Sequence, residues 1–401
     1  MIGQQAFQVI GKASPRYYGL AAAAAVVLGL GLIAAWYMEH HGHWVTGMDN
    51  QVVWGLPHVF AVFLIVAASG VLNIASISSV FGQAAYKPLA RLSGLMAIAL
   101  LLGGLAVLVL DLGRPDRLII AMTSFNFRSI FAWNIFLYTG FIAIVAIYLW
   151  LLMERRMAKW SGKAGLLAFI WRLVLTTGTG CIFGFLVARE AYDSAILAPL
   201  FIAMSLAFGL AIFMLALVVC YGREAALGGA LGGRMARLLA IFVAAVLYFT
   251  FLQHLTGIYG ARSHGIELYL LFDGGAVTAI FWLLQVGAGG IAPLLLLLWP
   301  VSGQRPAGSS AAAAALVVLG GLAQIYVIII GGQSYPLNLF PGYETSSSFF
   351  DGAVAGYAPS LPEFVLGLGG FALAAMIVML GLRILPILPL SLVDKAVDPP
   401  K

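Results

Sequence analysis

Charged residues are scarce in this chain of 401 residues: they make up 9% of the sequence, against 62% apolar residues, and the mean hydropathy is +1.03. Soluble domains carry roughly 25% charged residues. The scarcity excludes a soluble globular protein and indicates a polytopic membrane protein. The net charge of +6 comes without a basic patch interleaved with aromatic residues, so nothing in the composition points to nucleic-acid binding.

Cysteine is nearly absent, since Cys181 and Cys220 are the only two. They stand alone, form no CxxC or CxxCH pattern, and therefore hold neither an iron–sulfur cluster nor a covalently attached haem. A non-covalent haem needs two facing histidines on helices, and His58 and His254 are the only pair in the sequence at a similar depth. A di-haem cytochrome b would need more. We expect no haem and no iron–sulfur cluster in this chain.

Three more histidines stand close together before the second apolar run, at His40, His41 and His43. These side chains are of a type that binds metals, but no carboxylate or cysteine accompanies them at ligand spacing. We therefore expect a solvated loop and no metal site.

Apolar runs long enough to cross a bilayer, which takes roughly 20 residues, occur ten times in the sequence. Runs such as LLGGLAVLVL lack the alternation of a membrane β-barrel strand, and a helix satisfies its own backbone hydrogen bonds in lipid. The expected fold class is therefore all-α. We expect one domain over residues 1–401, with membrane helices at approximately 18–38, 52–80, 90–112, 128–152, 165–188, 194–221, 235–258, 268–300, 310–332 and 360–385.

Basic residues are distributed unevenly over the loops between these runs. When alternate loops are assigned to opposite sides, sixteen of the 21 Lys and Arg residues fall on the side of the two termini, and all 6 His residues fall on the other. The positive-inside rule makes the first side cytoplasmic. We expect a multi-pass protein of the bacterial inner (cytoplasmic) membrane, with both termini in the cytoplasm and an uncleaved first helix. The basic residues left on the outer side are Arg114, Arg117, Arg128, Arg189 and Arg262.

The centre of the predicted spans is poor in charge, where an ionisable residue would be costly and would point to function. Arg172 is assigned to the cytoplasmic side. The uncharged polar residues that remain are expected to form hydrogen bonds between helices. They include Ser69, Asn73, Ser76, Gln253, Gln285 and Gln324.

Polar residues gather instead near the outer ends of two consecutive spans. His58 lies about six residues into the second span, roughly 9 Å along its axis, and one turn after Trp54. The third span ends at Asp111-Leu-Gly-Arg114-Pro, because the residue before a proline resists the α conformation. Asp111 and Arg114 are spaced to form an ion pair. That spacing suits a structural pair as well as a functional one, but arginines persisting on the face otherwise poor in positive charge favour function.

Several of these segments resemble a known family. The stretch WGLPHVFAVFLIVAASG around His58, the DLGRPDR after the third span and the terminal RILPILP are similar to segments of the polysulfide reductase membrane subunits, also called the NrfD-like (PsrC-like) family. The resemblance covers nearly the full length and is nearest to the ten-helix branch, which includes DsrP, the membrane subunit of the sulfite-reductase-associated Dsr complex. It implies two four-helix bundles plus two extra helices.

The resemblance also implies a quinone-reactive subunit of a respiratory or sulfur-metabolism complex. Such a subunit binds menaquinone or ubiquinone without a cofactor of its own. On its periplasmic face it docks an iron–sulfur (ferredoxin-like) subunit, which exchanges electrons with further redox subunits. Two-electron quinone chemistry moves two protons, so it needs an acid/base pair near water and an apolar slot.

The family roles fall on the same residues that the topology singled out. His58 and Asp111 are assigned to the quinone head group, because histidine is the side chain that changes charge nearest neutral pH and Asp111 is placed to orient it. Arg114 is expected to keep Asp111 ionised. The further quinone-binding candidates, placed by depth in the membrane, are Trp54, Arg114, Tyr138, Arg189 and Glu190.

Two other functions stay open at this stage. A secondary transporter would place polar groups and broken helices at the midplane, where the glycine pairs 289–290 and 331–332 are the candidate breaks. A channel-like subunit would translocate protons without quinone chemistry. With no charge evident at the midplane, we expect the protons of quinone chemistry to exchange with the outer aqueous phase. The direction of electron flow and the terminal substrate are not encoded in any motif.

Overall fold

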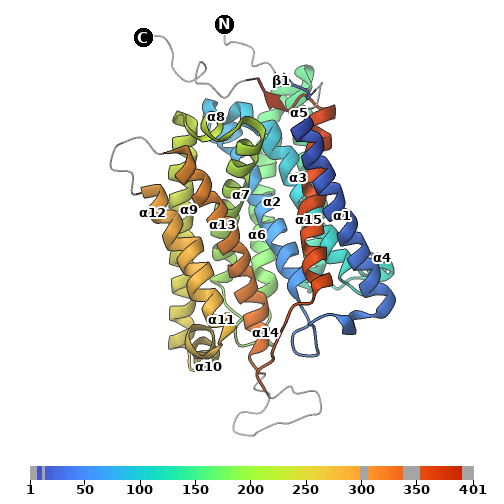
Figure 1. The fold of residues 1–401 in the computed structure, drawn as a ribbon, viewed down its shortest axis with the longest axis vertical. Coiled ribbons are helices and arrows are strands. Elements are labelled where there is room, and N and C mark those ends of the chain that lie inside the picture. The colour runs from blue at the N-terminus through green and yellow to red at the C-terminus, as the bar shows by residue number, and fades with distance from the viewer. Residues whose placement is uncertain (1–6, 11–13, 299–305, 337–352, 391–401) are drawn as a thin grey trace.

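Ten helical spans dominate the structure, a computed structural model that describes residues 7–10, 14–298, 306–336 and 353–390. The spans run side by side along the long axis of the molecule (Figure 1). The expected all-α class and the expected number of spans are confirmed. The spans are built from α1 (Pro15–His41), α2 (Leu56–Ser79), η2 with α3 (Ala84–Leu89, Ala90–Leu110), α5 (Ile130–Met153), η4 with α6 (Arg155–Trp160, Ser161–Gly184), α7 (Leu197–Tyr221), α9 (Ala230–Tyr259), α11 with η6 and α12 (Ala276–Ala279, Ile280–Ile291, Ala292–Leu298), α13 with η7 and α14 (Ala307–Tyr326, Val327–Gly331, Gly332–Ser334), and α15 (Leu361–Ile384).

Short elements connect the spans. The segments η5, η6 and η7 are π-helical, and both glycine pairs that were candidate breaks lie inside continuous helix. The connecting elements are η1 (His43–Val45), η3 (Pro115–Arg117), α4 (Leu118–Thr123), α8 (Arg223–Leu227), α10 (His264–Leu268) and η5 (Tyr269–Asp273), and the strands are β1 (Phe7–Gln8) and β2 (Leu388–Pro389).

Two groups of four spans form the core. The first bundle consists of α2, α3, α5 and α6. In the second, α7 packs with α9 and α13, and both α9 and α13 contact the span formed by η6 and α12. α1 and α15 pair with each other, and α15 lies against α3 and α2 (Figure 1). α2 contacts both bundles and is buried along most of its length. This arrangement agrees with two four-helix bundles plus two extra helices.

The two bundles meet backbone to backbone at a pair of glycines. A Cβ atom added to Gly70 of α2 would overlap the carbonyl of Ser205 in α7, and one added to Gly209 would overlap the backbone of Gly70 and Val71. In lipid, where apolar burial drives helix association little, small residues let helices approach this closely. The Gly70–Gly209 contact therefore sets the distance between the bundles.

In two spans the helix begins four or more residues later than predicted. The second span begins at Leu56 and not near residue 52, because the Asp49 carboxylate accepts the backbone N–H groups of Gln51 and Val52 and holds this segment as a turn. The eighth span begins at Ala276 and not near residue 268, because the chain turns through Gly275 at φ 55°, a conformation that glycine adopts without steric cost. α10 and η5 form a separate turn before it.

A two-residue ribbon joins the two ends of the described chain. β1 pairs antiparallel with β2, with Phe7 opposite Pro389 and Gln8 opposite Leu388. The Arg91 guanidinium adds a second tie, since it stacks on the Phe7 ring at 3.7 Å and donates to the Pro386 carbonyl at 2.8 Å. Both ends of the described part of the chain therefore lie at the same end of the bundles, as an even number of spans requires.

Candidate functional site

His58 and Asp111 meet at the end of the first bundle opposite the ribbon. Nδ1 of His58 lies 2.8 Å from Oδ2 of Asp111, with the Asp111 side chain 0% exposed and the His58 side chain 15% exposed. The expected proximity of these two residues is confirmed. The two atoms are close enough for a hydrogen bond, but the angles between the two side chains do not fit one. No described residue donates a hydrogen bond to either Asp111 oxygen. A buried carboxylate in this state is costly unless a cation or a donor faces it, so the site suits an imidazolium or a ligand hydroxyl.

Helix ends bring the two residues together. His58 lies in the first turn of α2, after Pro57, and Asp111 caps the end of α3. His58 is thus shallower than the six residues of helix that were predicted. The start of a helix carries a partial positive charge and the end a partial negative one, so α2 favours the carboxylate of Asp111 and α3 favours a charged His58.

Aromatic rings form a wall beside this pair. The Trp54 ring stacks near the His58 ring, with centroids 6.2 Å apart and planes at 24°. Phe131 and Phe183 pack on Trp54 at 6.1 and 5.9 Å. These rings offer a flat apolar surface next to an imidazole and a carboxylate. A planar, polar-edged molecule with an apolar body fits such surroundings.

Gln333, which was not predicted, fixes the backbone of Trp54. Its side-chain oxygen accepts the N–H groups of Val53 and Trp54, both at 3.0 Å, and its amide donates to the Trp54 carbonyl at 3.0 Å. Arg189 reaches the same loop, donating to the Gln51 carbonyl at 2.6 Å and to the Gln333 carbonyl at 3.3 Å. Burial lowers the pKa of Arg189, and Tyr192 and Asp49 oppose this. Arg189 therefore positions the Trp54 loop from outside it.

Glu363, which was also not predicted, anchors the start of α2. Its fully buried carboxylate accepts from the Tyr357 hydroxyl at 2.7 Å, the Gly47 N–H at 2.8 Å and the Ser360 N–H at 2.7 Å. The Tyr357 oxygen in turn accepts the Leu56 N–H at 2.6 Å, a helix-start donor that would otherwise lack a partner. Burial first, and then the bond to Glu363, raise the pKa of Tyr357 above its ordinary value. The hydroxyl thus stays protonated and caps the start of α2.

The expected pairing of Arg114 with Asp111 was wrong. Gly113 turns the chain at φ 69°, so the Arg114 side chain leaves the site, is 63% exposed and lies 3.3 Å from Asp116. His43 occupies the space instead: its ring packs against Gly113, and its Nε2 is buried without a hydrogen-bond partner among the described residues. The expectation of a solvated loop therefore fails for His43, whereas its neighbours His40 and His41 are exposed.

Two further candidates lie apart from the pair. Tyr138 is buried in α5 with its hydroxyl beside Thr179 of α6, and within the described part of the chain no hydrogen bond or ion pair joins it to His58 or Asp111. Glu190 is half-buried beside Arg189. Burial raises the pKa of Glu190, and Arg262 partly offsets this. Neither residue is part of the His58–Asp111 cluster.

Arg172, which was assigned to the cytoplasmic side, lies inside the first bundle. Arg172 lies midway along α6, is 2% exposed, and donates to the Asn73 side chain of α2 at 2.9 Å. One turn further along α6, Thr176 shares a hydrogen bond with Ser69 of α2. The polar residues of α2 do join helices, as predicted, but one partner is a buried guanidinium that the positive-inside assignment had counted with the loops.

His254, the other histidine considered for haem, belongs to a separate cluster. Nδ1 of His254 bonds Glu267 at 2.6 Å, in the second bundle, whereas His58 faces Asp111 in the first. Each histidine therefore has its own carboxylate. Among the described residues, no group of three or more His, Cys, Asp or Glu side chains is arranged to hold a metal ion.

Comparison with known proteins identifies similar sequences. The family model described as Polysulphide reductase, NrfD matches residues 44–336. The Hdr-like menaquinol oxidoreductase integral membrane subunit of Archaeoglobus fulgidus is 30% identical over 404 residues, covering 98% of this chain and 99% of the relative. A putative dimethyl sulfoxide reductase membrane subunit of Halobacterium salinarum is 31% identical over 401 residues, covering 90% and 89%. A polysulfide reductase chain of Wolinella succinogenes is 24% identical over 311 residues, covering 71% and 96%.

Proposed function

This chain belongs to the polysulphide reductase NrfD family, and we propose that it is the subunit of a multisubunit oxidoreductase that binds and reacts with quinone. The observation that carries the proposal is the His58–Asp111 contact, in which a fully buried carboxylate keeps both oxygens without a hydrogen-bond donor among the described residues. A quinol hydroxyl is a donor of the right kind. The aromatic wall around Trp54 suits a flat ring.

Each residue of the site has a separate task in this proposal. Quinone supplies the two-electron chemistry, and the chain supplies places for the protons. With Nδ1 of His58 turned to Asp111, Nε2 is the ring atom left to take a proton from, or give one to, the head group. Asp111 stabilises the charged imidazole and sets its orientation. Gln333, Arg189 and Tyr357 hold the loop and the helix start that carry Trp54 and His58.

The partners of the chain follow from the same proposal. The relative from Archaeoglobus fulgidus is named as a menaquinol oxidoreductase subunit, and we infer that menaquinone or ubiquinone is the substrate here. Electrons then pass between the quinone and an iron–sulfur, ferredoxin-like subunit on the periplasmic face, and on to further redox subunits. A place in sulfur metabolism, as for DsrP, belongs to this proposal too. The chain itself carries neither haem nor cluster.

The function is tested on the chain purified with its native partners. We expect the complex to exchange electrons with a menaquinol analogue and to contain an iron–sulfur subunit. The isolated membrane subunit is expected to give no haem band in a reduced-minus-oxidised spectrum, because His58 and His254, the pair considered for haem, are each paired with a carboxylate. A haem band that disappears in His58→Ala would overturn the proposal in favour of a cytochrome.

The orientation of the chain is tested by cysteine labelling. The two native cysteines are first removed by Cys181→Ser and Cys220→Ser. Single thiols are then introduced at two exposed positions: Gln83→Cys, in the loop between α2 and α3, and Gly356→Cys, in the loop before α15. These two loops are expected on opposite sides of the membrane. We expect a membrane-impermeant maleimide on intact cells to label Gly356→Cys alone, because the basic loops face the cytoplasm. Labelling of Gln83→Cys on intact cells and not of Gly356→Cys would invert the topology and place the site on the cytoplasmic face.

A further inference from the structure

A second buried histidine–carboxylate pair lies in the second bundle and takes no part in the proposed quinone site. Nδ1 of His254, near the end of α9, is 2.6 Å from Oε2 of Glu267 in α10. The two side chains are 11% and 7% exposed, and the His254 ring packs edge-on against Phe281 at 4.9 Å. Because Nδ1 is occupied, Nε2 is the atom of this ring that remains for exchange with another group.

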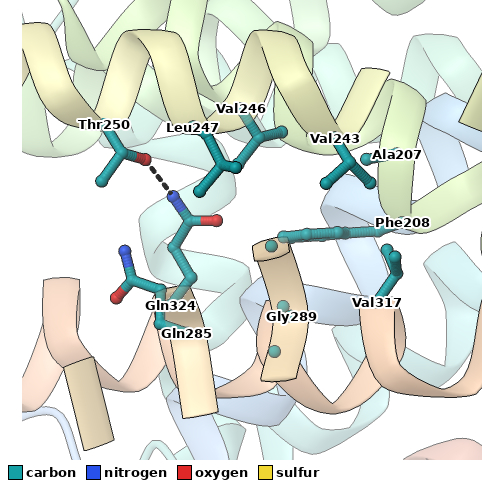
Figure 2. A pocket seen from close by; sticks show the side chains of 13 residues that line it. Ala207, Phe208, Val243, Val246, Leu247, Thr250, Gln285, Gly289, Val317 and Gln324 are labelled. Carbon is teal, nitrogen blue, oxygen red and sulfur yellow. Dashed lines mark hydrogen bonds between the residues drawn. The ribbon is translucent and has the colours of Figure 1, made fainter. Parts of the chain in front are cut away.

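Two adjoining cavities lead from this pair into the bundle. One is lined by His254 and by residues before α7 and along η7. The other lies between α7, α9, η6 and α13. The three residues that line both cavities are all polar: Thr250, Gln285 and Gln324. Figure 2 shows these three side chains gathered at one end of the second cavity, with Phe208 at the other.

One polar atom at the junction of the cavities, the side-chain oxygen of Gln285, lacks a hydrogen-bond partner in the described part of the chain, and water could supply one. The Gln324 amide donates to the Thr250 hydroxyl at 2.9 Å (Figure 2). Gln285 is 7% exposed, and its side-chain oxygen has no hydrogen-bond partner among the described residues. A buried acceptor left unsatisfied costs about 1–3 kcal/mol. An ordered water needs polar neighbours and space, and this junction offers both.

Backbone geometry marks the same place. Gln285 lies in the π-helical segment η6, and the π-helical segment η7 contributes Val327 and Ile328 to the cavity beside His254. The π-helix is rare and concentrates at functional sites. Thr250 is nine residues from the end of α9 at Tyr259, about 13 Å along the axis. That is close to the middle of a hydrocarbon core about 30 Å thick.

We propose that hydrogen-bonded water in these cavities connects the His254–Glu267 pair with the middle of the membrane, and that this route carries protons between the outer surface and the second bundle while the complex turns over. The proton moves between water and Nε2 of His254, with Glu267 holding Nδ1, and no other bond changes. The neutral groups Thr250, Gln285 and Gln324 orient the water. The route is separate from His58 and Asp111.

The first test looks for the water directly. X-ray hydroxyl-radical footprinting modifies side chains that lie next to ordered water. In the complete complex we expect modification of Leu247, which lines the second cavity, several-fold above that of Phe141, which is packed in the first bundle. Thr250→Val and Gln285→Leu should lower the modification of Leu247 to the level of Phe141. Thr256→Val, an exposed threonine on α9, is the control and should change nothing. Equal modification of Leu247 and Phe141 in the wild type would overturn the proposal.

The second test measures protons during turnover and rests on the proposed quinone function. In vesicles, His254→Gln and Gln285→Leu are expected to lower the number of protons moved per electron by at least a third, with the electron-transfer rate within about twofold of wild type. An unchanged proton-to-electron ratio in assembled Gln285→Leu would overturn the route. The quinone function is judged by the electron-transfer rate of His58→Ala, and the proton route by the proton-to-electron ratio of Gln285→Leu. Failure of one proposal can therefore be distinguished from failure of the other.

Discussion

His58→Ala and Asp111→Asn should each lower the rate of quinone-linked electron transfer by about 100-fold or more, which is the low end of what a positioned acid or base contributes. The reason is the 2.8 Å contact between them. Without His58 no group accepts the proton at the head group, and without the Asp111 charge the imidazole loses the partner that stabilises its charged form. The double variant should be little worse than either single one, as for residues that act as a unit. The rate is measured with a menaquinol analogue on the purified complex.

The matched control is His264→Ala. His264 is an exposed histidine in α10 whose Nδ1 lies 3.1 Å from the Ile258 carbonyl, and its replacement should leave the rate unchanged. All variants must copurify with the partner subunits in wild-type ratio. Additive losses, or wild-type turnover in a correctly assembled His58→Ala complex, would move the site away from the first bundle, and His254 would be the first residue to examine.

Gly209→Val should prevent the stable assembly of the membrane subunit. The added side chain would overlap the backbone of Gly70 and Val71, and a backbone cannot rotate away as a side chain does. Overpacking of a core typically lowers the free energy of unfolding by about 1–3 kcal/mol even when side chains can shift. We therefore expect Gly209→Val to lower it by about 3 kcal/mol or more. The measurement is thermal unfolding of the detergent-solubilised complex, together with its yield after size-exclusion chromatography.

Gly29→Val provides the comparison for this effect. Gly29 also lies inside a spanning helix, α1, but no atom lies within 4 Å of a Cβ added there. The same substitution should therefore leave yield and unfolding temperature close to wild type. A Gly209→Val complex as stable as Gly29→Val would mean that α2 and α7 are not held at backbone distance.

The parts of the fold that were predictable are those encoded locally. Hydrophobic length alone locates ten spans, and two consecutive antiparallel helices must bring their adjoining ends together, so the contact of His58 with Asp111 followed from span order. The turn at Asp49 and the break at Gly275 were missed, because an apolar run says nothing about where within it the helix starts. Arg172 was misplaced for a related reason. Counting charges by loop assumes that every basic residue lies in a loop, whereas the Arg172 guanidinium donates a hydrogen bond to Asn73 inside the bundle.

The rest of the candidate site depends on contacts between distant parts of the chain. Gln333 holds Trp54 across 279 positions, and Tyr357 caps α2 across 301. No periodicity or motif links such residues. In the sequence, Gln333 follows an apolar run and Glu363 stands near the start of another, and nothing distinguishes them from other polar residues near the ends of spans. Only the packing of the second bundle and α15 against the start of α2 gives them their roles.

The β1–β2 ribbon bears on how this protein is handled in the laboratory. Because Phe7 and Pro389 are paired, two halves of a split fluorescent protein attached to the two chain ends would meet within one molecule at a high effective concentration. Fluorescence from such a fusion would report that the two ends of one polypeptide have come together, and not that two copies have associated. Tests for self-association therefore need the two halves on separate polypeptides, each attached at the same end.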